Sequence, residues 1–99
     1  MKKSNPFISI CILSYNRPKF LKELINSIDL NNSNEYEIII NDDCSPRISE
    51  IEKVVESFKS KPCIFLKNNR NKGYDESLIN LVRKASGEWI IFMGDDDVF

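Results

Sequence analysis

The sequence predicts an α/β fold in which a parallel sheet is built in a Rossmann-like βαβαβαβ order. Four short apolar runs rich in β-branched residues alternate along the chain with three segments whose apolar residues recur every three or four positions. Strands that alternate with helices imply right-handed crossovers, and therefore a parallel sheet with helices on both faces. The chain of 99 residues is long enough for one hydrophobic core, so we expect residues 1–99 to form a single domain.

The first strand is expected over residues 7–13, where "FISICIL" is nearly continuous in apolar residues, as in a strand buried on both faces. The segment "SYNRP" interrupts this run, and its Pro18 is a residue favoured in the first turn of a helix. That helix carries an apolar face at helical spacing, made of Phe20, Leu21, Leu24, Ile25 and Ile28. The second strand is expected over residues 36–41, "YEIIIN".

In the second half of the chain, Ser45 is the expected N-cap of a helix and Pro46 its first residue. The apolar face of this helix comprises Ile48, Ile51, Val54, Val55 and Phe58. The third strand is expected over residues 63–67, and Asp75 is the candidate cap of a third helix that carries Leu78, Ile79, Val82 and Ala85. Gly87 stands where a left-handed helix terminator is expected, and the fourth strand covers residues 88–93.

Composition excludes several classes of function. The formal net charge is -1 and no basic stripe is present, so nucleic acid is not an expected partner. The chain has no histidine and three widely separated cysteines, which disfavours a zinc site and is typical of a reducing compartment. No stretch approaches the roughly 20 apolar residues that cross a bilayer, so we expect no transmembrane segment in this chain.

Polar residues gather just after each predicted strand, and in open parallel sheets ligands bind at the carboxyl ends of the strands. The residues concerned are Ser14, Tyr15, Asn16 and Arg17, then Asp42 and Asp43, residues 68–75, and Asp95, Asp96 and Asp97. The glycine fingerprint of dinucleotide-binding folds does not follow the first strand, so a backbone phosphate cradle is not expected there.

Each of these groups has a structural and a functional interpretation. Asp42 and Asp43 either complement the positive end of the following helix or accept hydrogen bonds from a ligand. Tyr15 either packs on the edge of the core or offers a flat face on which a base stacks. The three carboxylates at 95–97 repel one another, so they form either a solvated capping loop or a site for Mg²⁺ or Mn²⁺.

The order of "ISICILSYNRPKFLKELINSI", "YEIIINDDCS" and "NNRNKGYDESLINLVRKASGEWIIFMGDDD" resembles the N-terminal, nucleotide-binding half of family 2 glycosyltransferases of the GT-A fold. The likeness runs from Ile8 to Phe99. Enzymes of this family are inverting and use nucleotide-diphosphate sugars. The resemblance therefore implies a nucleotide-sugar donor, uridine diphosphate-linked, and a divalent cofactor, Mn²⁺ or Mg²⁺.

The resemblance also implies roles for individual residues. Tyr15, between Ser14 and Asn16, corresponds to the family's T/S-Y-N segment near the donor base, and Asp43 to the acid that hydrogen-bonds the base. Gly73 and Asn80 correspond to the glycine and the second asparagine of the NxGxxxAxN loop. In the DxD motif Asp95 falls on the middle position, next to the donor, while Asp96 and Asp97 are the expected metal ligands. The sequence departs from the family pattern at Asn41, Cys44, Ile79 and Gly94.

By the same resemblance, the activity would be transfer of a sugar to an acceptor hydroxyl on a glycan or a lipid-linked glycan. The general base of this family follows the DxD segment, so we expect it downstream of Phe99 and expect the 99-residue portion to be inactive alone. The expected location is cytoplasmic, compatible with the inner face of the membrane and with an oligomer. The alternative is a stand-alone nucleotide-binding or regulatory module.

Overall fold

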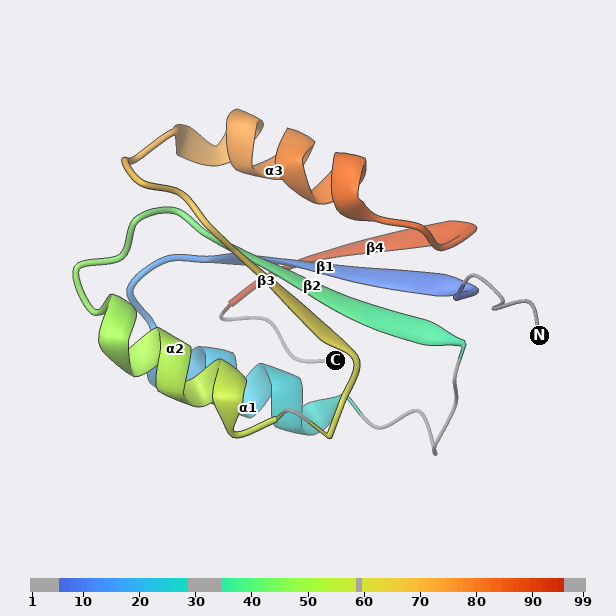
Figure 1. Cartoon of the computed structure of the whole chain (residues 1–99), viewed down its shortest axis with the longest axis horizontal. Helices are drawn as coiled ribbons and strands as arrows, with labels where there is room; N and C mark the ends of the chain where they lie inside the picture. The colour runs from blue at the N-terminus through green and yellow to red at the C-terminus, as the bar shows by residue number, and fades with distance from the viewer. Residues whose placement is uncertain (1–5, 29–34, 59, 96–99) are drawn as a thin grey trace.

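The computed structural model describes residues 6–28, 35–58 and 60–95, and it confirms the α/β class (Figure 1). All the pairings among its four strands are parallel. The strands are β1 (Ile8–Ser14), β2 (Tyr36–Asp42), β3 (Cys63–Lys67) and β4 (Trp89–Gly94). The helices are α1 (Pro18–Ser27), α2 (Ile48–Glu56) and α3 (Gly73–Lys84).

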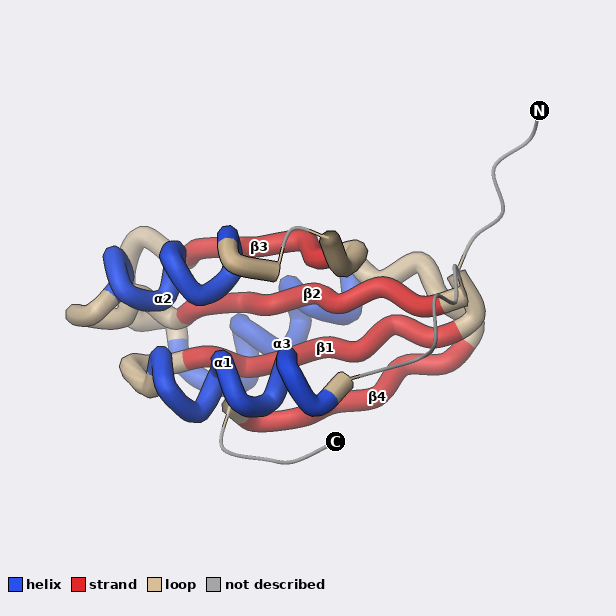
Figure 2. Tube along the Cα trace, turned by 90° about the horizontal axis from the view of Figure 1, so that it is seen from below, coloured by secondary structure: helices blue, strands red, loops and turns tan. Residues whose placement is uncertain are grey.

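The strand order is β3-β2-β1-β4, so β2 and β3 are added on one side of β1 and β4 is added on the other side. The chain moves from β1 to β2 to β3 by way of α1 and α2, which lie together on one face of the sheet (Figures 1 and 2). It then returns through α3 on the opposite face and adds β4 on the other side of β1 (Figure 1). The switch point is therefore the gap between the carboxyl ends of β1 and β4, where doubly wound sheets bind ligands.

The core lies on both faces of the two central strands, with the larger cluster under α1 and α2. Isoleucines of β1 and β2 pack there with Leu21, Leu24, Ile25 and Ile51 of the two helices. The smaller cluster, under α3, joins Cys11, Ile39 and Leu81. Because α3 contacts β1 and β2, it leaves the edge strand β4 half-exposed, and the apolar side chains from Trp89 to Phe92 are not buried in the described part of the chain.

Two of the predicted helix starts are wrong. The second helix begins later than predicted, and the third begins earlier. α2 begins at Ile48 with Arg47 at the N-cap position, and the hydroxyl of Ser45 binds Asp42 instead. α3 begins at Gly73, so Asp75 lies inside its first turn. The predicted apolar faces also change, since Phe20, Ile79 and Val82 are exposed and Ser77 and Leu81 form the buried face of α3.

Gly87 does not terminate a helix in the left-handed conformation, since α3 ends earlier, at Lys84, and the one positive-φ glycine among the described residues is Gly73. A Cβ on Gly87 would lie 2.7 Å from both the backbone nitrogen and the Oγ of Ser9. Its N–H donates to that Oγ at 2.8 Å, and Ser9 in turn donates to the buried carboxylate of Glu37 at 2.6 Å. Close approach of two backbones, rather than a special dihedral angle, explains glycine here.

We predict that Gly87→Ala destabilises the protein by about 1 to 3 kcal/mol, because the methyl group meets backbone that has no room to move. Chemical denaturation measures the free energy of unfolding. The control is Lys84→Ala, an exposed change three residues earlier that we expect to stay within about 0.5 kcal/mol of the wild type. A Gly87→Ala protein as stable as this control would contradict the close contact.

Candidate functional site

A cavity of about 420 Å³ opens at the switch point between the carboxyl ends of the strands and α3. Its walls come from the ends of β1, β2 and β4 and from the first turn of α3. The residues that line it are Leu13, Ser14, Tyr15, Arg17, Asn41, Asp43, Gly73, Tyr74, Ser77, Gly94 and Asp95. Such a cavity of apolar walls with a few convergent polar groups is the usual form of a small-molecule site.

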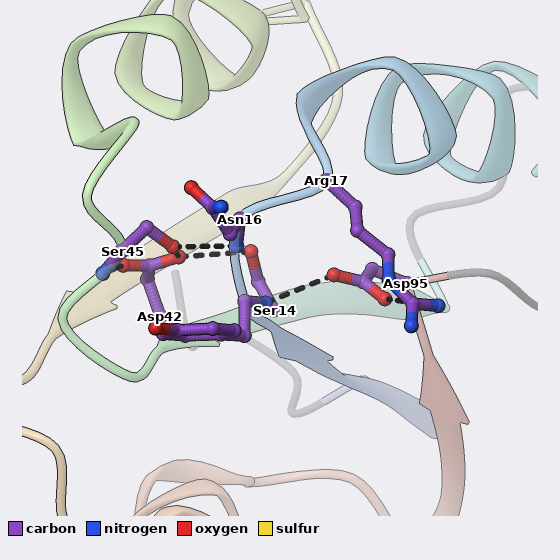
Figure 3. A network of polar contacts seen from close by, with 7 residues as sticks. Ser14, Asn16, Arg17, Asp42, Ser45 and Asp95 are labelled. Carbon is purple, nitrogen blue, oxygen red and sulfur yellow. Dashed lines mark hydrogen bonds and ion pairs between the residues drawn. The ribbon is translucent and has the colours of Figure 1, made fainter.

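The loop after β1 is held by a buried carboxylate, that of Asp42 (Figure 3). Asp42 accepts a hydrogen bond from the hydroxyl of Ser14 at 3.0 Å, and Ser45 donates both its backbone N–H, at 2.9 Å, and its hydroxyl, at 2.5 Å. With these partners, the charge of a buried aspartate is compensated by hydrogen bonds. Asp42 is therefore a structural residue that ties the ends of β1 and β2 together.

Asn16 extends this network toward α2 (Figure 3). Its backbone N–H donates to the Oγ of Ser45 at 2.8 Å, and its side-chain oxygen accepts the N–H of Arg47, the N-cap residue of α2, at 3.0 Å. Its φ of 56° lies in the left-handed region, where asparagine is among the few favoured side chains. In the described residues Asn16 thus shapes the loop that presents Tyr15 and does not itself line the cavity.

Asp43 caps α3 rather than the helix that directly follows it. Its carboxylate accepts the backbone N–H groups of Lys72 at 2.7 Å and Gly73 at 3.1 Å, and the side-chain amide of Asn68 at 2.9 Å. Burial alone raises the pKa of the Asp43 carboxyl, but hydrogen bonds, led by that from Lys72, outweigh burial and lower the pKa below its usual value. Asp43 is thus held as an ionised hydrogen-bond acceptor on the cavity wall.

Asp95 stands at the end of β4, only 7% exposed, and faces the loop after β1 (Figure 3). One carboxylate oxygen accepts the backbone N–H of Tyr15 at 2.9 Å, and the other lies 3.9 Å from the guanidinium of Arg17. Two segments separated by 80 positions are thereby joined across the switch point. The predicted metal ligands Asp96 and Asp97 lie outside the described residues.

The described residues alone do not assemble a metal site, since they contain no group of three or more His, Cys, Asp or Glu side chains that could hold an ion. Mg²⁺ is, however, typically held by one or two carboxylates while phosphate oxygens supply other ligands. Asp95 contributes one buried carboxylate to the lining of the cavity. The donor chemistry of this edge therefore fits a divalent cation that also binds a diphosphate.

Of the residues predicted from sequence to bind a ligand, Ser14, Tyr15, Asp43, Gly73 and Asp95 meet at this cavity. Asn80 does not line it. Its amide lies 3.4 Å from the side-chain oxygen of Asn68, at the edge of a second cavity of about 460 Å³ on the other side of α3.

Two polar lining residues were not among the predicted site candidates: Asn41 and Ser77. The polarity of Asn41 in an otherwise apolar strand was the available signal in the sequence. Ser77 lies on the buried face of α3, and the apolar face predicted for that helix did not include it.

The fold and the cavity together define a doubly wound α/β protein with a candidate ligand site at its switch point. A model of the family described as glycosyl transferase family 2 matches residues 9–99. An uncharacterized glycosyltransferase of Haemophilus influenzae is 37% identical over 92 residues, which cover 93% of this chain and 30% of that protein.

Two solved structures share the fold. TarS of Staphylococcus aureus, in complex with UDP-GlcNAc, has a TM-score of 0.84 at 25% identity over 93% of this chain and 27% of its own. A mannosyltransferase of Pyrobaculum calidifontis, in complex with GDP-Man and Mn²⁺, has a TM-score of 0.83 at 17% identity over 97% of this chain and 29% of its own.

The chain belongs to glycosyltransferase family 2, and its four-stranded parallel sheet matches the GT-A fold of these neighbours. It spans about a third or less of the length of the relatives it matches. Within the described residues, no helix is both long enough and apolar enough to cross a bilayer.

We predict that the stabilising contribution of Asp43 is lost in acid. Its pKa is lower in the folded protein than in the unfolded chain, so the contribution is complete above the ordinary aspartate pKa of about 4 and disappears as the pH falls through the folded value. At pH 7 we expect Asp43→Asn to lower the free energy of unfolding by about 0.5 to 2 kcal/mol, the usual effect of a lost helix cap.

Denaturation of both proteins at neutral pH and at about pH 3 measures this difference, which should shrink in acid. Asp75→Asn, an exposed change in the first turn of the same helix, controls for the general effect of removing a negative charge there. A difference between wild type and Asp43→Asn that is independent of pH would contradict the capping role.

Proposed function

We propose that this chain is the donor-binding portion of a longer inverting glycosyltransferase. The portion is one domain over residues 1–99. The donor is a nucleotide-diphosphate sugar, and its nucleotide is UDP. The observation that supports this most directly is the cavity at the switch point, where Tyr15, Asp43 and Asp95 meet from three strand ends. TarS, a structural neighbour at 25% identity, is in complex with UDP-GlcNAc, which supports a uridine donor.

The nucleobase is bound between an aromatic ring and an ionised carboxylate. Tyr15 is 45% exposed at the cavity, so its ring is available for stacking. The carboxylate of Asp43 accepts three hydrogen bonds within the protein, from Asn68, Lys72 and Gly73. Since a carboxylate has about four acceptor sites, one remains for an N–H group of the base.

The diphosphate lies toward the end of β4. Asp95 lines the cavity there and orients the Tyr15 loop through the N–H of Tyr15, while Asp96 and Asp97 are the proposed ligands of Mn²⁺ or Mg²⁺. A bound divalent cation supplies Lewis-acid stabilisation of the negative charge that develops on the diphosphate leaving group. The structural neighbour in complex with GDP-Man and Mn²⁺ supports the choice of cation.

Transfer requires an acceptor hydroxyl that attacks the anomeric carbon from the face opposite the leaving group and gives its proton to a carboxylate base. We place that base downstream of Phe99, and the acceptor, a glycan or lipid-linked glycan, with it. This 99-residue portion would then bind donor without transferring sugar. The proposed location is cytoplasmic, where sugar nucleotides are available, at the inner face of the membrane if the acceptor is lipid-linked.

The second candidate function is a stand-alone nucleotide-binding module without transferase activity. It shares the cavity and differs in the metal, because a sensor that only binds nucleotide has no leaving group to stabilise. Metal dependence of binding therefore separates the two functions.

We predict that the protein binds UDP at least about tenfold more tightly with Mn²⁺ than without, since a cation held by Asp96 and Asp97 would offset the negative charge of the diphosphate. Titration calorimetry measures both affinities. Asp96→Asn and Asp97→Asn should each weaken the binding seen with Mn²⁺ and leave metal-free binding unchanged, whereas the exposed Asp75→Asn control should change neither. Equal UDP affinity with and without Mn²⁺ in the wild type would favour the nucleotide-binding module.

We also predict that Tyr15→Ala weakens UDP binding by about 1 to 3 kcal/mol, the usual contribution of one stacked base. This corresponds to a dissociation constant about 5 to 150 times larger. Tyr15→Phe keeps the ring and should retain wild-type affinity in the same titration. An unchanged affinity in Tyr15→Ala would assign this side chain to the edge of the core instead.

A further inference from the structure

Asn41 is a fully buried asparagine whose side chain has no hydrogen-bond partner in the described part of the chain. It is the penultimate residue of β2, lies in register between Leu13 of β1 and Leu66 of β3, and is 0% exposed. Neither its Oδ1 nor its Nδ2 has a partner among the described residues. Asn41 is therefore a polar residue between two leucines.

Such a side chain is costly to the folded protein. A buried polar group that gives up its hydrogen bonds to water without replacing them destabilises the folded protein. For that reason nearly all buried polar groups in folded proteins are paired. A leucine at this position would continue the row formed by Leu13 and Leu66 without this cost. An unpartnered amide in a core row is therefore expected where a ligand or water completes its hydrogen bonds.

The position of Asn41 indicates a ligand. Asn41 lines the donor cavity together with Tyr15 and Asp43, and it also borders the second cavity beyond α3. It lies two residues before Asp43, about 7 Å along an extended chain. Both side chains are on the α3 face, since Asp43 binds the start of α3 and the row of Asn41 packs against Leu81.

We propose that Asn41 reads the hydrogen-bonding edge of the nucleobase from the floor of the donor cavity. This inference rests on the proposed function, since it names a residue that selects the base of the donor.

The chemistry of the two side chains limits the bases that they can select. The ionised carboxylate of Asp43 only accepts hydrogen bonds, whereas the amide of Asn41 can donate through Nδ2. A base that carries an N–H group beside a carbonyl satisfies both, with the N–H donating to Asp43 and the carbonyl accepting from Asn41. Uracil has this arrangement, as does guanine, whereas adenine, which has no carbonyl, lacks it.

The test is Asn41→Leu in the full chain, with titrations of UDP and ADP in the presence of Mn²⁺. We expect UDP to bind about tenfold more weakly and the ratio of UDP to ADP affinity to fall by a similar factor, because the lost hydrogen bond discriminates between the bases. The melting temperature of the ligand-free variant should equal or exceed that of the wild type, since an unpartnered polar group has been removed. Loss of binding with unchanged or higher stability separates a ligand contact from a packing effect.

The matched control is Ile39→Leu, a fully buried residue on the same strand and the same face that lines neither cavity. It should leave both nucleotide affinities unchanged. If the leucine variant does not fold, Asn41→Ala removes the same amide without adding volume and should weaken UDP in the same way.

Unchanged UDP affinity in a folded Asn41→Leu protein would overturn the inference, because the amide would then be satisfied by water alone. An equal loss for UDP and ADP would also overturn base reading. If the wild type binds neither nucleotide, the proposed function itself fails, so the two failures are distinguishable.

Discussion

The bond between the carboxylate of Asp43 and the first backbone N–H groups of α3 is the interaction on which the candidate site depends. It joins the end of a central strand to the start of a helix about thirty residues later. The helix returns across the sheet on the face opposite α1 and α2, so this bond fixes one wall of the cavity relative to the other. The negative charge also complements the positive end of the helix. One carboxylate thus positions a wall and keeps an acceptor directed at the space inside it.

A second carboxylate, that of Asp42, has a purely structural role. Asp42 binds Ser14 and Ser45, and Ser45 binds the backbone of Asn16, so that the loop presenting Tyr15 is held by a network of short hydrogen bonds. Adjacent aspartates thereby have different environments, since Asp42 is buried and Asp43 lies on the wall of the cavity. Rigid supporting contacts of this kind hold binding residues in place before the ligand arrives.

Much of the fold could be predicted from the sequence because it depends on local periodicity. Local sequence patterns predict the strand at 63–67 and the alternation of strands and helices. They also predict that Tyr15 and Asp43 follow the ends of their strands. The starts of α2 and α3 could not be predicted, since Asp43 caps a helix distant in sequence while Ser45, a good local cap, is used by Asp42. Gly87 was assigned to the wrong cause for the same reason: the contact that requires glycine is with Ser9, at the other end of the chain. Asn80, which was assigned from the family motif, borders the second cavity and does not line the first.

Gly73 has a consequence for chirality. Its φ is +87°, yet a Cβ added there would meet no atom within 4 Å, so the position needs a backbone conformation and not an absence of volume. An L-residue is disfavoured there by its own backbone sterics, whereas its mirror image prefers positive φ. A D-alanine at position 73 would have the backbone conformation that this position already adopts. One wall of the cavity thus depends on a left-handed backbone conformation at Gly73, whose N–H donates to Asp43.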